Sequence, residues 1–320
     1  MSIETQVASV QMPEVVVNRS TPKEPAVGRV VGTRLCTAGR KAAAFVRHVE
    51  IDVSNTPLAG SFRAGQSFGV VPPGTDAMGK PHKVRLYSLS CPTRGEDGNG
   101  NVIATSVKRV IDEDWKTHKL FVGVCSNYLA DLNVGDEVRV TGPSGKRFVL
   151  PSNPCDYNYL FFATGTGIAP FRGMTHDLVA AGCRNPVVLI AGSPYTTDLI
   201  YHDEFLNLAA QHKNIRYFTA ISRERQSDGH DRMYVDGRMH TERDTLIPLL
   251  ARANTLIYIC GLCGMEVGIY RQLATHLTGS DLARYLEVDG ATLGNLLAWD
   301  RKTIANKVRK TDRVFTEVYD

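Results

Sequence analysis

The stretch Tyr159-Leu-Phe-Phe-Ala163 leads into Thr164-Gly-Thr-Gly-Ile-Ala-Pro-Phe171, and this junction decides the fold of the second half of the chain. A short apolar run of this kind is typical of a strand that is buried on both faces. Gly165 and Gly167 allow a tight turn, and the N-terminus of a following helix would offer free N–H groups to a pyrophosphate. The turn departs from the G-x-G-x-x-G pattern, and glycine is often needed there for packing alone.

Strands and helices alternate on both sides of this junction. We expect strands at 159–163, 187–191, 215–221 and 256–260, with helices at 172–181, 203–211, 245–252 and 265–277. This alternation predicts a doubly wound parallel sheet over residues 153–320, covered by helices on both faces. A ligand is expected at the carboxyl end of the first strand of such a sheet.

The first half of the chain has a different rhythm. Short apolar runs at 27–35, 43–53, 84–89, 102–110 and 137–140 alternate with turn signals, and a short helix is expected at 127–132. This spacing predicts an antiparallel β-barrel or sandwich over residues 27–152. Residues 1–26 are polar, contain three prolines and show no period, so we expect a flexible N-terminal arm.

Composition restricts the class of protein. The 320 residues carry a net charge of +4, and 43% are hydrophobic, which excludes a collagen or a disordered chain. No apolar run approaches the roughly 18 residues that span a membrane, and the start lacks a signal pattern, so we expect a soluble, cytoplasmic protein without membrane insertion. The basic excess lies within residues 1–152, which suits an acidic protein partner. Nucleic-acid binding is not expected, because no basic cluster is interleaved with aromatic residues.

The seven cysteines do not suggest a disulfide framework, because their number is odd in a long chain. One C-x-x-C pair, Cys260 and Cys263, has no second pair beside it. A zinc or iron–sulfur site normally needs four ligands, so we expect no metal here.

Several motifs occur together in one order along the chain. They are Arg85-Leu-Tyr-Ser88, Gly123-Val-Cys-Ser-Asn-Tyr-Leu129, Gly165-Thr-Gly-Ile-Ala-Pro-Phe-Arg172, Ser222-Arg-Glu224, Arg232-Met-Tyr234, Cys260-Gly261 with Gly264-Met-Glu266, and Glu317-Val-Tyr319. In this order they resemble the plant-type ferredoxin–NADP⁺ reductases over residues 27 to 319. The resemblance implies an FAD-binding β-barrel at 27–152 and an NADP(H)-binding α/β domain at 153–320.

The resemblance also implies an FAD site. Arg85 would pair with the pyrophosphate, Tyr87 would stack on the flavin ring, and the hydroxyl of Ser88 would lie near flavin N5. The structural alternatives are a packed strand aromatic for Tyr87 and a plain helix N-cap for Ser126. The residues implied for FAD are Arg85, Leu86, Tyr87, Ser88, Ser106, Val107, Lys108, Gly123, Val124, Cys125, Ser126, Thr166 and Tyr319.

A site for NADP(H) is implied in the second domain. Two arginines and a serine suit the 2′-phosphate dianion, and Tyr234 would stack on adenine. The structural alternative is a solvated loop. The residues implied for NADP(H) are Lys108, Thr166, Gly167, Ser193, Pro194, Ser222, Arg223, Arg232, Tyr234, Gly261, Leu262 and Glu317.

Four residues are implied for hydride transfer: Ser88, Cys260, Glu317 and Tyr319. Cys260 and Glu317 would lie beside the nicotinamide, and Tyr319 would cover the flavin and move aside. Each has a structural alternative: a buried strand cysteine for Cys260, a solvated carboxylate for Glu317 and a frayed chain end for Tyr319.

The chain departs from the family in four places. Asp112 stands where plant members carry a tyrosine that stacks on the flavin adenine, and Trp115 is a candidate substitute. Asp236 replaces a glutamine near the 2′-phosphate, where a carboxylate opposes the dianion. Asp320 follows the usual terminal tyrosine, and the segment 287–312 is longer than in the family.

The resemblance implies an oxidoreductase that moves electrons between NADP(H) and a one-electron carrier such as ferredoxin or a flavodoxin-like acidic protein. Hydride would pass between flavin N5 and nicotinamide C4. Two alternatives remain: the NADPH-oxidising reductase of a multicomponent oxygenase, and a non-catalytic nucleotide-sensing protein.

Overall fold

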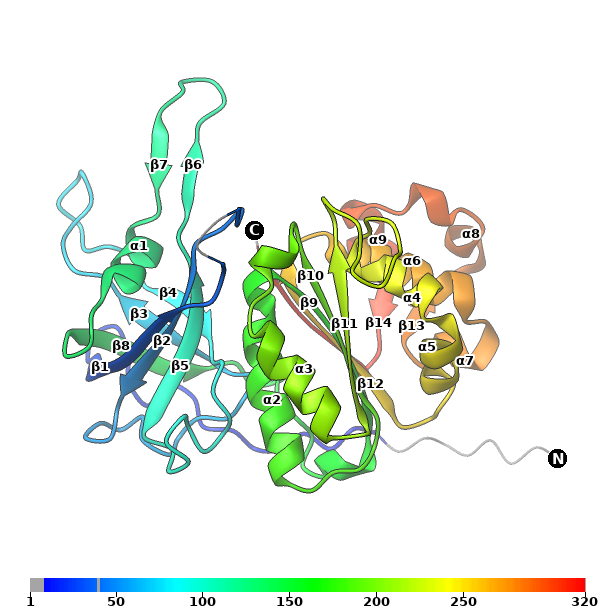
Figure 1. The fold of residues 1–320 in the computed structure, drawn as a ribbon, viewed down its shortest axis with the longest axis horizontal. Helices are drawn as coiled ribbons and strands as arrows, with labels where there is room; N and C mark the ends of the chain where they lie inside the picture. The colour runs from blue at the N-terminus through cyan, green and yellow to red at the C-terminus, as the bar shows by residue number, and fades with distance from the viewer. Residues whose placement is uncertain (1–8, 39–40, 320) are drawn as a thin grey trace.

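The first half of the chain forms an antiparallel sheet with the strand order β4-β3-β8-β1-β2-β5, as the sequence predicts. The computed structural model describes residues 9–38 and 41–319. β1 alternates buried and exposed residues, which is typical of a sheet with one face on a core. The strands curve into the barrel-like domain on the left of Figure 1. They are β1 (Ala26–Leu35), β2 (Val46–Asp52), β3 (Ser67–Val71), β4 (Arg85–Ser88), β5 (Val102–Lys108) and β8 (Glu137–Ser144).

A long hairpin and a short helix extend from this barrel. β6 (Ile111–Glu113) and β7 (Leu120–Val122) form a separate two-stranded ribbon that stands out from the barrel (Figure 1). α1 (Val124–Asp131) follows the ribbon directly and begins three residues before the expected helix. The sequence analysis predicted a strand-like run at 102–110 but neither strand of this ribbon.

The second half is a parallel sheet in the order β11-β10-β9-β12-β15, which confirms the predicted architecture. Its strands are β9 (Asn158–Thr164), β10 (Val187–Ser193), β11 (Ile215–Ile221), β12 (Thr255–Leu262) and β15 (Val314–Tyr319). The helices around it are α2 (Ala169–Ala180), α3 (His202–Gln211), α4 (Arg238–Thr241), α5 (Arg243–Leu250) and α6 (Met265–His276). None of the described helices is long and apolar enough to cross a membrane.

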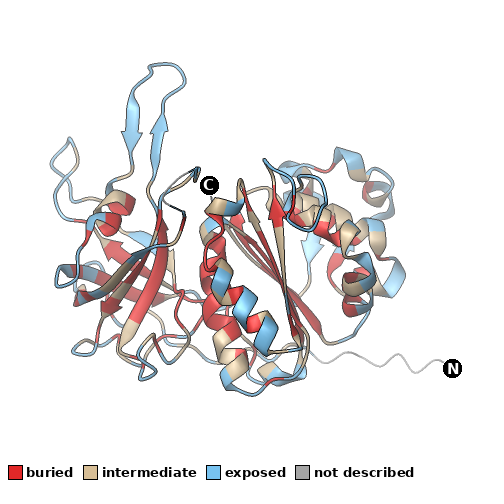
Figure 2. Cartoon of the chain, in the orientation of Figure 1, coloured by how far each residue is buried: buried red, intermediate tan, exposed pale blue. Residues whose placement is uncertain are grey.

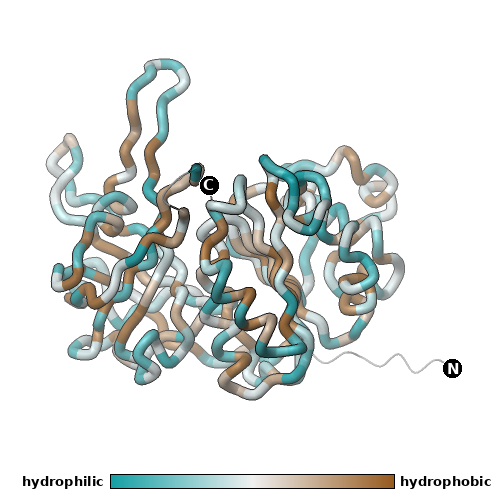
Figure 3. The backbone as a smooth tube through the Cα atoms, in the orientation of Figure 1, coloured by the Kyte–Doolittle hydropathy of each residue, from teal (hydrophilic) through white to brown (hydrophobic). Residues whose placement is uncertain are grey.

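The sheet separates two apolar layers. Residues of alternating parity along β9 pack into different clusters, with Phe161 on one face and Phe162 on the other. The strands are therefore buried on both sides, as the burial colouring in Figure 2 and the hydropathy colouring in Figure 3 make visible. This explains why the sequence of β9 is a continuous apolar run rather than an alternating one.

The segment before β15 forms a small layer of its own over α6. It comprises α7 (Gly279–Ala283), β13 (Leu286–Val288), α8 (Gly290–Leu293), α9 (Arg301–Lys307) and β14 (Val308–Lys310). Trp299 anchors this layer, because its ring is buried in the core cluster and its indole N–H donates to the carbonyl of Thr292. Side chains of the long segment 287–312 thus belong to the same apolar cluster as the buried side chains of α6.

The described part of the N-terminal arm lies along both domains, which corrects the expectation of a loose segment. Val10 and Met12 pack against the core of the second domain. Val16 accepts a hydrogen bond from Gln66 at 3.0 Å, and the backbones of Ser20 and Gly142 pair in both directions. Backbone pairing of this kind leaves no periodic pattern in the side chains, so the sequence did not reveal it. Residues 1–8 lie outside the described residues.

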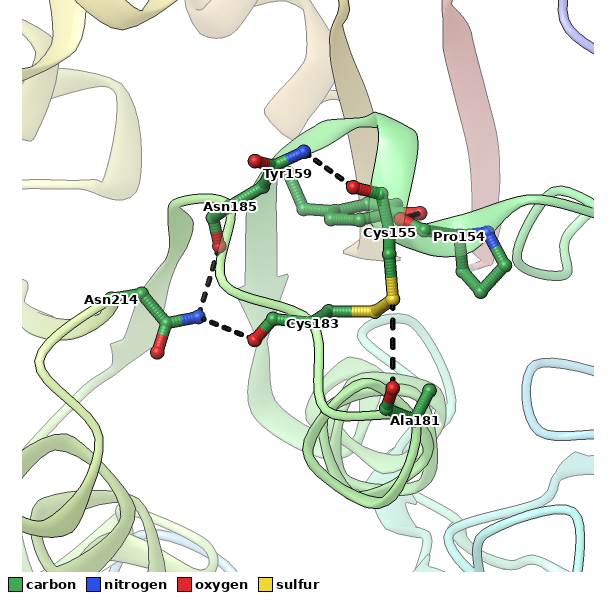
Figure 4. The surroundings of a disulfide bond; sticks show 7 residues. All are labelled: Pro154, Cys155, Tyr159, Ala181, Cys183, Asn185 and Asn214. Atoms are coloured by element: carbon green, nitrogen blue, oxygen red, sulfur yellow. Dashed lines mark hydrogen bonds between the residues drawn. A yellow bond between two sulfur atoms is a disulfide. The ribbon is translucent and has the colours of Figure 1, made fainter.

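Cys155 and Cys183 form a disulfide. The sequence analysis did not anticipate this disulfide, because an odd number of cysteines in a long chain indicated no pairing. It joins the residues before β9 to the loop after α2, and it closes a segment that contains the glycine turn (Figure 4). Asn214 donates to the carbonyls of Cys183 and Asn185, so the same loop is also held from the β11 side.

Candidate active site

The glycine turn between β9 and α2 is in van der Waals contact with the end of β12. A Cβ atom on Gly167 would lie 2.2 Å from the carbonyl oxygen of Cys260, and one on Gly261 would lie 2.1 Å from Thr164 Oγ1. Glycine is therefore required at both positions for the two loops to approach. The amide of Leu262 donates to Thr164 Oγ1 at 2.8 Å, which ties the loops together. Their backbones meet at the carboxyl edge of the sheet, where ligands of such folds bind.

β15 brings the C-terminal residues to the same edge. It pairs with β12 in parallel, so that Cys260 lies opposite Glu317 and Leu262 opposite Tyr319. The Tyr319 hydroxyl lies 2.8 Å from Thr166 Oγ1 in the glycine turn. Tyr319 is thus held at the site and is not a frayed end, because its strand is paired with a buried neighbour. Asp320 lies outside the described residues.

Glu317 has an unusual environment for a carboxyl group. Burial raises its pKa to about 7. Burial, followed by the charge of Glu317, raises the pKa of Cys260 well above its ordinary range. Cys260 is therefore a protonated thiol, and Glu317 changes its charge near neutral pH, as is typical of acid–base groups.

The barrel contributes its edge strand β4 to the same side of the molecule. Ser88 pairs with Ser67, and Ser67 pairs with Ser144. Gly145, the next residue, lies beside Glu317, with the carboxyl oxygen 3.8 Å from where its Cβ would be. The end of β8, two strands from β4 in the barrel sheet, therefore lies beside the strand that carries Glu317.

The aromatic ring of Tyr87 is half-buried on β4. It packs 6.5 Å from the ring of Phe68, and burial followed by contact with Cys125 raises the pKa of its hydroxyl. Arg85 and Leu86 at the start of the same strand are exposed. Tyr87 is thus a strand aromatic that packs against Phe68 while its side chain stays only half-buried.

The segment Gly123–Ser126 forms the start of α1. Ser126 lies in the first turn and not at the N-cap, which is Gly123. Its hydroxyl accepts from the amide of Val110 at 3.2 Å and donates to the carbonyl of Gly123 at 3.2 Å. The simple N-cap alternative for Ser126 is therefore wrong, since its hydroxyl links the helix start to Val110, the residue before β6.

Three of the expected site residues lie on β5. Ser106 and Val107 are buried, and Lys108 is exposed. The Oγ of Ser106 is buried without a hydrogen-bond partner among the described residues. A buried hydroxyl without a partner costs free energy unless a ligand or water satisfies it.

An exposed loop after β11 carries the residues expected to hold the 2′-phosphate. The amides of Ser222 and Arg223 donate to the carbonyls of Ser193 and Pro194, each at 3.0 Å. Arg223, Arg232 and Tyr234 are exposed, so their polar groups are free to meet a ligand.

A buried glutamine shapes this loop. The Nε2 group of Gln226 donates to the carbonyls of Ile221 and Asp231, and its Oε1 accepts from the amide of Ile221. Sequence reasoning missed Gln226, because a single glutamine in a polar loop carries no pattern. Its amide closes the loop and thereby brings Arg232 back toward β11.

Asp236 lies under this loop and faces α6. Its carboxyl carbon lies 2.6 Å from where a Cβ on Gly268 would be. Burial raises its pKa, which the charge of Arg271 opposes. The carboxylate therefore packs over a glycine of α6, and a larger residue at position 268 would displace it.

These features fit FAD and NADP(H) as ligands. A Cβ on Gly165 would have no atom within 4 Å, so the turn is open at that position, and the hydroxyl of Ser106 is buried without a partner among the described residues. Exposed guanidinium groups at Arg85 and Arg223 suit phosphate oxygens. Bound there, the flavin would supply the exchange of hydride for single electrons.

The fold and this site define a two-domain nucleotide-dependent oxidoreductase, and comparisons with known proteins agree. Residues 161–270 match the oxidoreductase NAD-binding domain family. The ferredoxin–NADP reductase of Thermosynechococcus vestitus is 36% identical over 86% of this chain and 72% of its own length. The leaf-type chloroplastic isozyme of Nicotiana tabacum is 38% identical, over 80% of this chain and 70% of its own length.

A solved structure of the ferredoxin–NADP⁺ reductase from Plasmodium falciparum has the same fold, with a TM-score of 0.68 at 22% identity. The match covers 94% of this chain and 98% of the Plasmodium falciparum chain. The chain belongs to the ferredoxin–NADP reductase family.

Proposed function

We propose that this chain is an FAD-containing oxidoreductase that transfers electrons between NADP(H) and ferredoxin. The observation that carries the proposal is the meeting of β9, β12 and β15 at one edge, with Thr166, Cys260, Glu317 and Tyr319 around it. Family membership supports both cofactors and the carrier. In this proposal residues 27–152 bind FAD and residues 153–320 bind NADP(H).

The residues have separate roles in the proposed reaction. Arg85 and the start of α1 would hold the FAD pyrophosphate, and Tyr87 would orient the flavin ring. Arg223 and Arg232 would hold the 2′-phosphate, and the glycine turn would admit the NADP(H) backbone. Tyr319 would exclude water from the flavin face until the nicotinamide arrives. Its hydrogen bond to Thr166 supports this role, because one bond of this kind is readily exchanged.

The protein itself would handle the proton. Oxidation of NADPH by two one-electron carriers releases one proton, which must leave a buried site. The carboxyl of Glu317, with its pKa of about 7, can accept that proton and release it near neutral pH. The hydroxyl of Ser88 would pass this proton between Glu317 and the ligand.

The test is the visible spectrum of the purified protein during anaerobic addition of NADPH and then NADH. Fast bleaching of a bound flavin by NADPH and slow bleaching by NADH is the expected result. A protein that stays colourless when FAD is added contradicts the flavin assignment and favours a nucleotide sensor. Turnover with an oxygenase component but not with ferredoxin would identify a different carrier.

We also propose a residue that replaces the missing adenine-stacking tyrosine. Asp112 is paired with Phe121 across the β6–β7 hairpin, so the two side chains lie on the same face. The Phe121 side chain is 59% exposed, whereas Trp115 lies beyond the strand ends and is 93% exposed. Phe121 therefore offers an aromatic ring beside the position of the tyrosine, from a paired strand and not from a turn.

Replacing Phe121 with alanine is expected to weaken FAD binding by about 5- to 150-fold, because stacking of a base on an aromatic ring contributes about 1–3 kcal/mol. Trp115→Ala is the matched control and should change the dissociation constant less than about twofold. Fluorescence titration of the apoprotein with FAD measures both. A loss confined to Trp115→Ala would instead assign the stacking to Trp115.

A cytoplasmic location is part of the proposal. The relative from Nicotiana tabacum is named chloroplastic, so the proposed location differs from that of this relative. Fractionation of source cells tests the location directly.

A further inference from the structure

His48 is a buried histidine at the boundary between the two domains. It lies on β2, on the face opposite the barrel core residues Val49 and Ile51. Its Nδ1 lies 2.8 Å from the hydroxyl of Tyr201, which belongs to the second domain. Its Nε2 is buried and has no hydrogen-bond partner among the described residues. Such an atom is costly unless something binds it.

Two carboxylates face this nitrogen. Nε2 lies 3.2 Å from Glu50 Oε1 and 3.9 Å from Glu96 Oε1, but the directions do not form hydrogen bonds. In the tautomer in which Nδ1 donates to Tyr201, the lone pair of Nε2 faces the carboxylate oxygens, and a cation between them would bind all three groups.

The spacing of these atoms suits a metal ion. At metal–ligand distances of about 2.1 Å, two ligands at a tetrahedral angle lie roughly 3.4 Å apart. The separations of 3.2 Å and 3.9 Å from Nε2 lie on either side of this value. One ligand atom from each of His48, Glu50 and Glu96 lies within 4.8 Å of the others. The hydrogen bond of Nδ1 to Tyr201 is the outer contact that fixes a metal-binding imidazole in one tautomer.

The charges around the cluster also favour a cation. Arg172 contacts both Glu96 and Glu204, with Nη1 2.5 Å from Glu96 Oε1 and Nε 2.8 Å from Glu204 Oε1. The guanidinium groups of Arg34 and Arg172 act on three carboxylates, Glu50, Glu96 and Glu204, which leaves one carboxylate charge for a cation. Glu96 keeps Arg172 as a partner through its second oxygen, which lies 3.1 Å from Nη2.

A glycine makes room for one of the carboxylates. Gly32 on β1 is paired with Glu50, and a Cβ on Gly32 would lie 2.6 Å from Glu50 Oε2. A side chain at position 32 would therefore push the carboxylate away from its place beside His48. Glu50 is also the ligand nearest to solvent, with 31% of its side chain exposed against 16% for Glu96, so an ion has access from that side.

We propose that His48, Glu50 and Glu96 form a zinc-binding site at the domain interface, with a water molecule in the fourth position. One imidazole and two carboxylates are a ligand set that Zn²⁺ accepts at these distances. The ion would join β2 to the loop between β4 and β5, which Arg172 of α2 already contacts. All three ligands lie in residues 27–152, so the ion would stabilise the barrel beside its contact with α2. This inference does not rest on the proposed electron transfer.

The experiment uses the full chain, freed of metal with a chelator and titrated with Zn²⁺ against a chromophoric competitor. We expect one tight site per chain. Glu50→Gln should weaken it at least tenfold, and Gly32→Ala should weaken it by displacing Glu50. Asp52→Asn is the matched control, because Asp52 lies two residues further along the same face of β2. Its affinity should stay within about twofold of the wild type.

The melting temperature provides the second readout. Saturating Zn²⁺ should raise it for the wild type and for Asp52→Asn but not for Glu50→Gln, because an ion bound only to the folded state stabilises that state. Absence of a tight site in the wild type would overturn the proposal. Equal zinc affinity in the wild type and in Glu50→Gln would overturn it as well, because the ion would then bind elsewhere, for example at a free thiol.

Discussion

Replacing Glu317 with glutamine is expected to lower kcat for NADPH oxidation by about 100-fold, because removing a positioned acid–base group typically costs 10²–10⁴-fold. Glutamine keeps the shape of the side chain but cannot exchange a proton. The cause lies in the burial of Glu317 opposite Cys260 on the paired strand. Stopped-flow reduction of the flavin and steady-state turnover with ferredoxin measure the effect.

The pH profile should distinguish this role from a structural one. Because burial disfavours the charged form, Glu317 is protonated below about pH 7 and charged above it. The charged form accepts the released proton, so wild-type NADPH oxidation should rise as the pH increases through about 7. That inflection should be lost in Glu317→Gln.

Two controls accompany this variant. Glu137→Gln removes an exposed carboxylate of the barrel that pairs with Arg29, and it should leave the profile unchanged. The spectrum of the bound flavin should be the same in all three proteins. A Glu317→Gln enzyme that retains both its rate and the inflection would show that the proton leaves by another route.

Replacing Arg223 and Arg232 together with alanine is expected to raise KM for NADPH by about 100-fold, with kcat little changed. Hydrogen bonds to charged groups contribute about 1.5–3 kcal/mol each, and both arginines would bind the 2′-phosphate before and during the reaction. NADH lacks that phosphate, so its KM should change less than about twofold. The preference for NADPH over NADH should therefore fall by nearly the same factor of about 100.

Arg225→Ala is the matched control for this double variant. Arg225 lies on the same exposed loop, but its guanidinium is 3.6 Å from Asp231. It should leave KM for NADPH within about threefold of the wild type. An equal rise for NADPH and NADH in the double variant would instead indicate that the loop, which Gln226 closes, has lost its shape.

Features that depend on neighbouring residues were predicted from the sequence, whereas features that depend on contacts between distant residues were missed. The strand, glycine turn and helix at 159–171 are visible in the sequence, because each depends on neighbouring residues. β15 was missed as a strand, although Glu317 and Tyr319 were expected at the site. Its partner β12 lies about fifty residues earlier, and no local pattern records a parallel pairing.

The site shows the same division. The resemblance named Arg223, Arg232 and Tyr234, and the structure has them exposed on one loop. It did not reveal Gln226, which closes that loop, or Phe121, whose relation to Asp112 depends on the register of the hairpin. Position along a strand pair is set by pairing and turn geometry, so neither residue could be assigned before the fold was known.

The sequence by itself determined the two architectures, their order, the glycine turn and the family motifs, because hydrophobic periodicity and backbone freedom are local properties. Only the tertiary structure decided which distant residues meet: Cys155 with Cys183, Tyr319 with Thr166, and His48 with Glu50 and Glu96. Burial of Glu317 and of His48 is likewise a consequence of packing, and burial is what changes their pKa values. The chemistry of these groups therefore arises where the two domains pack together.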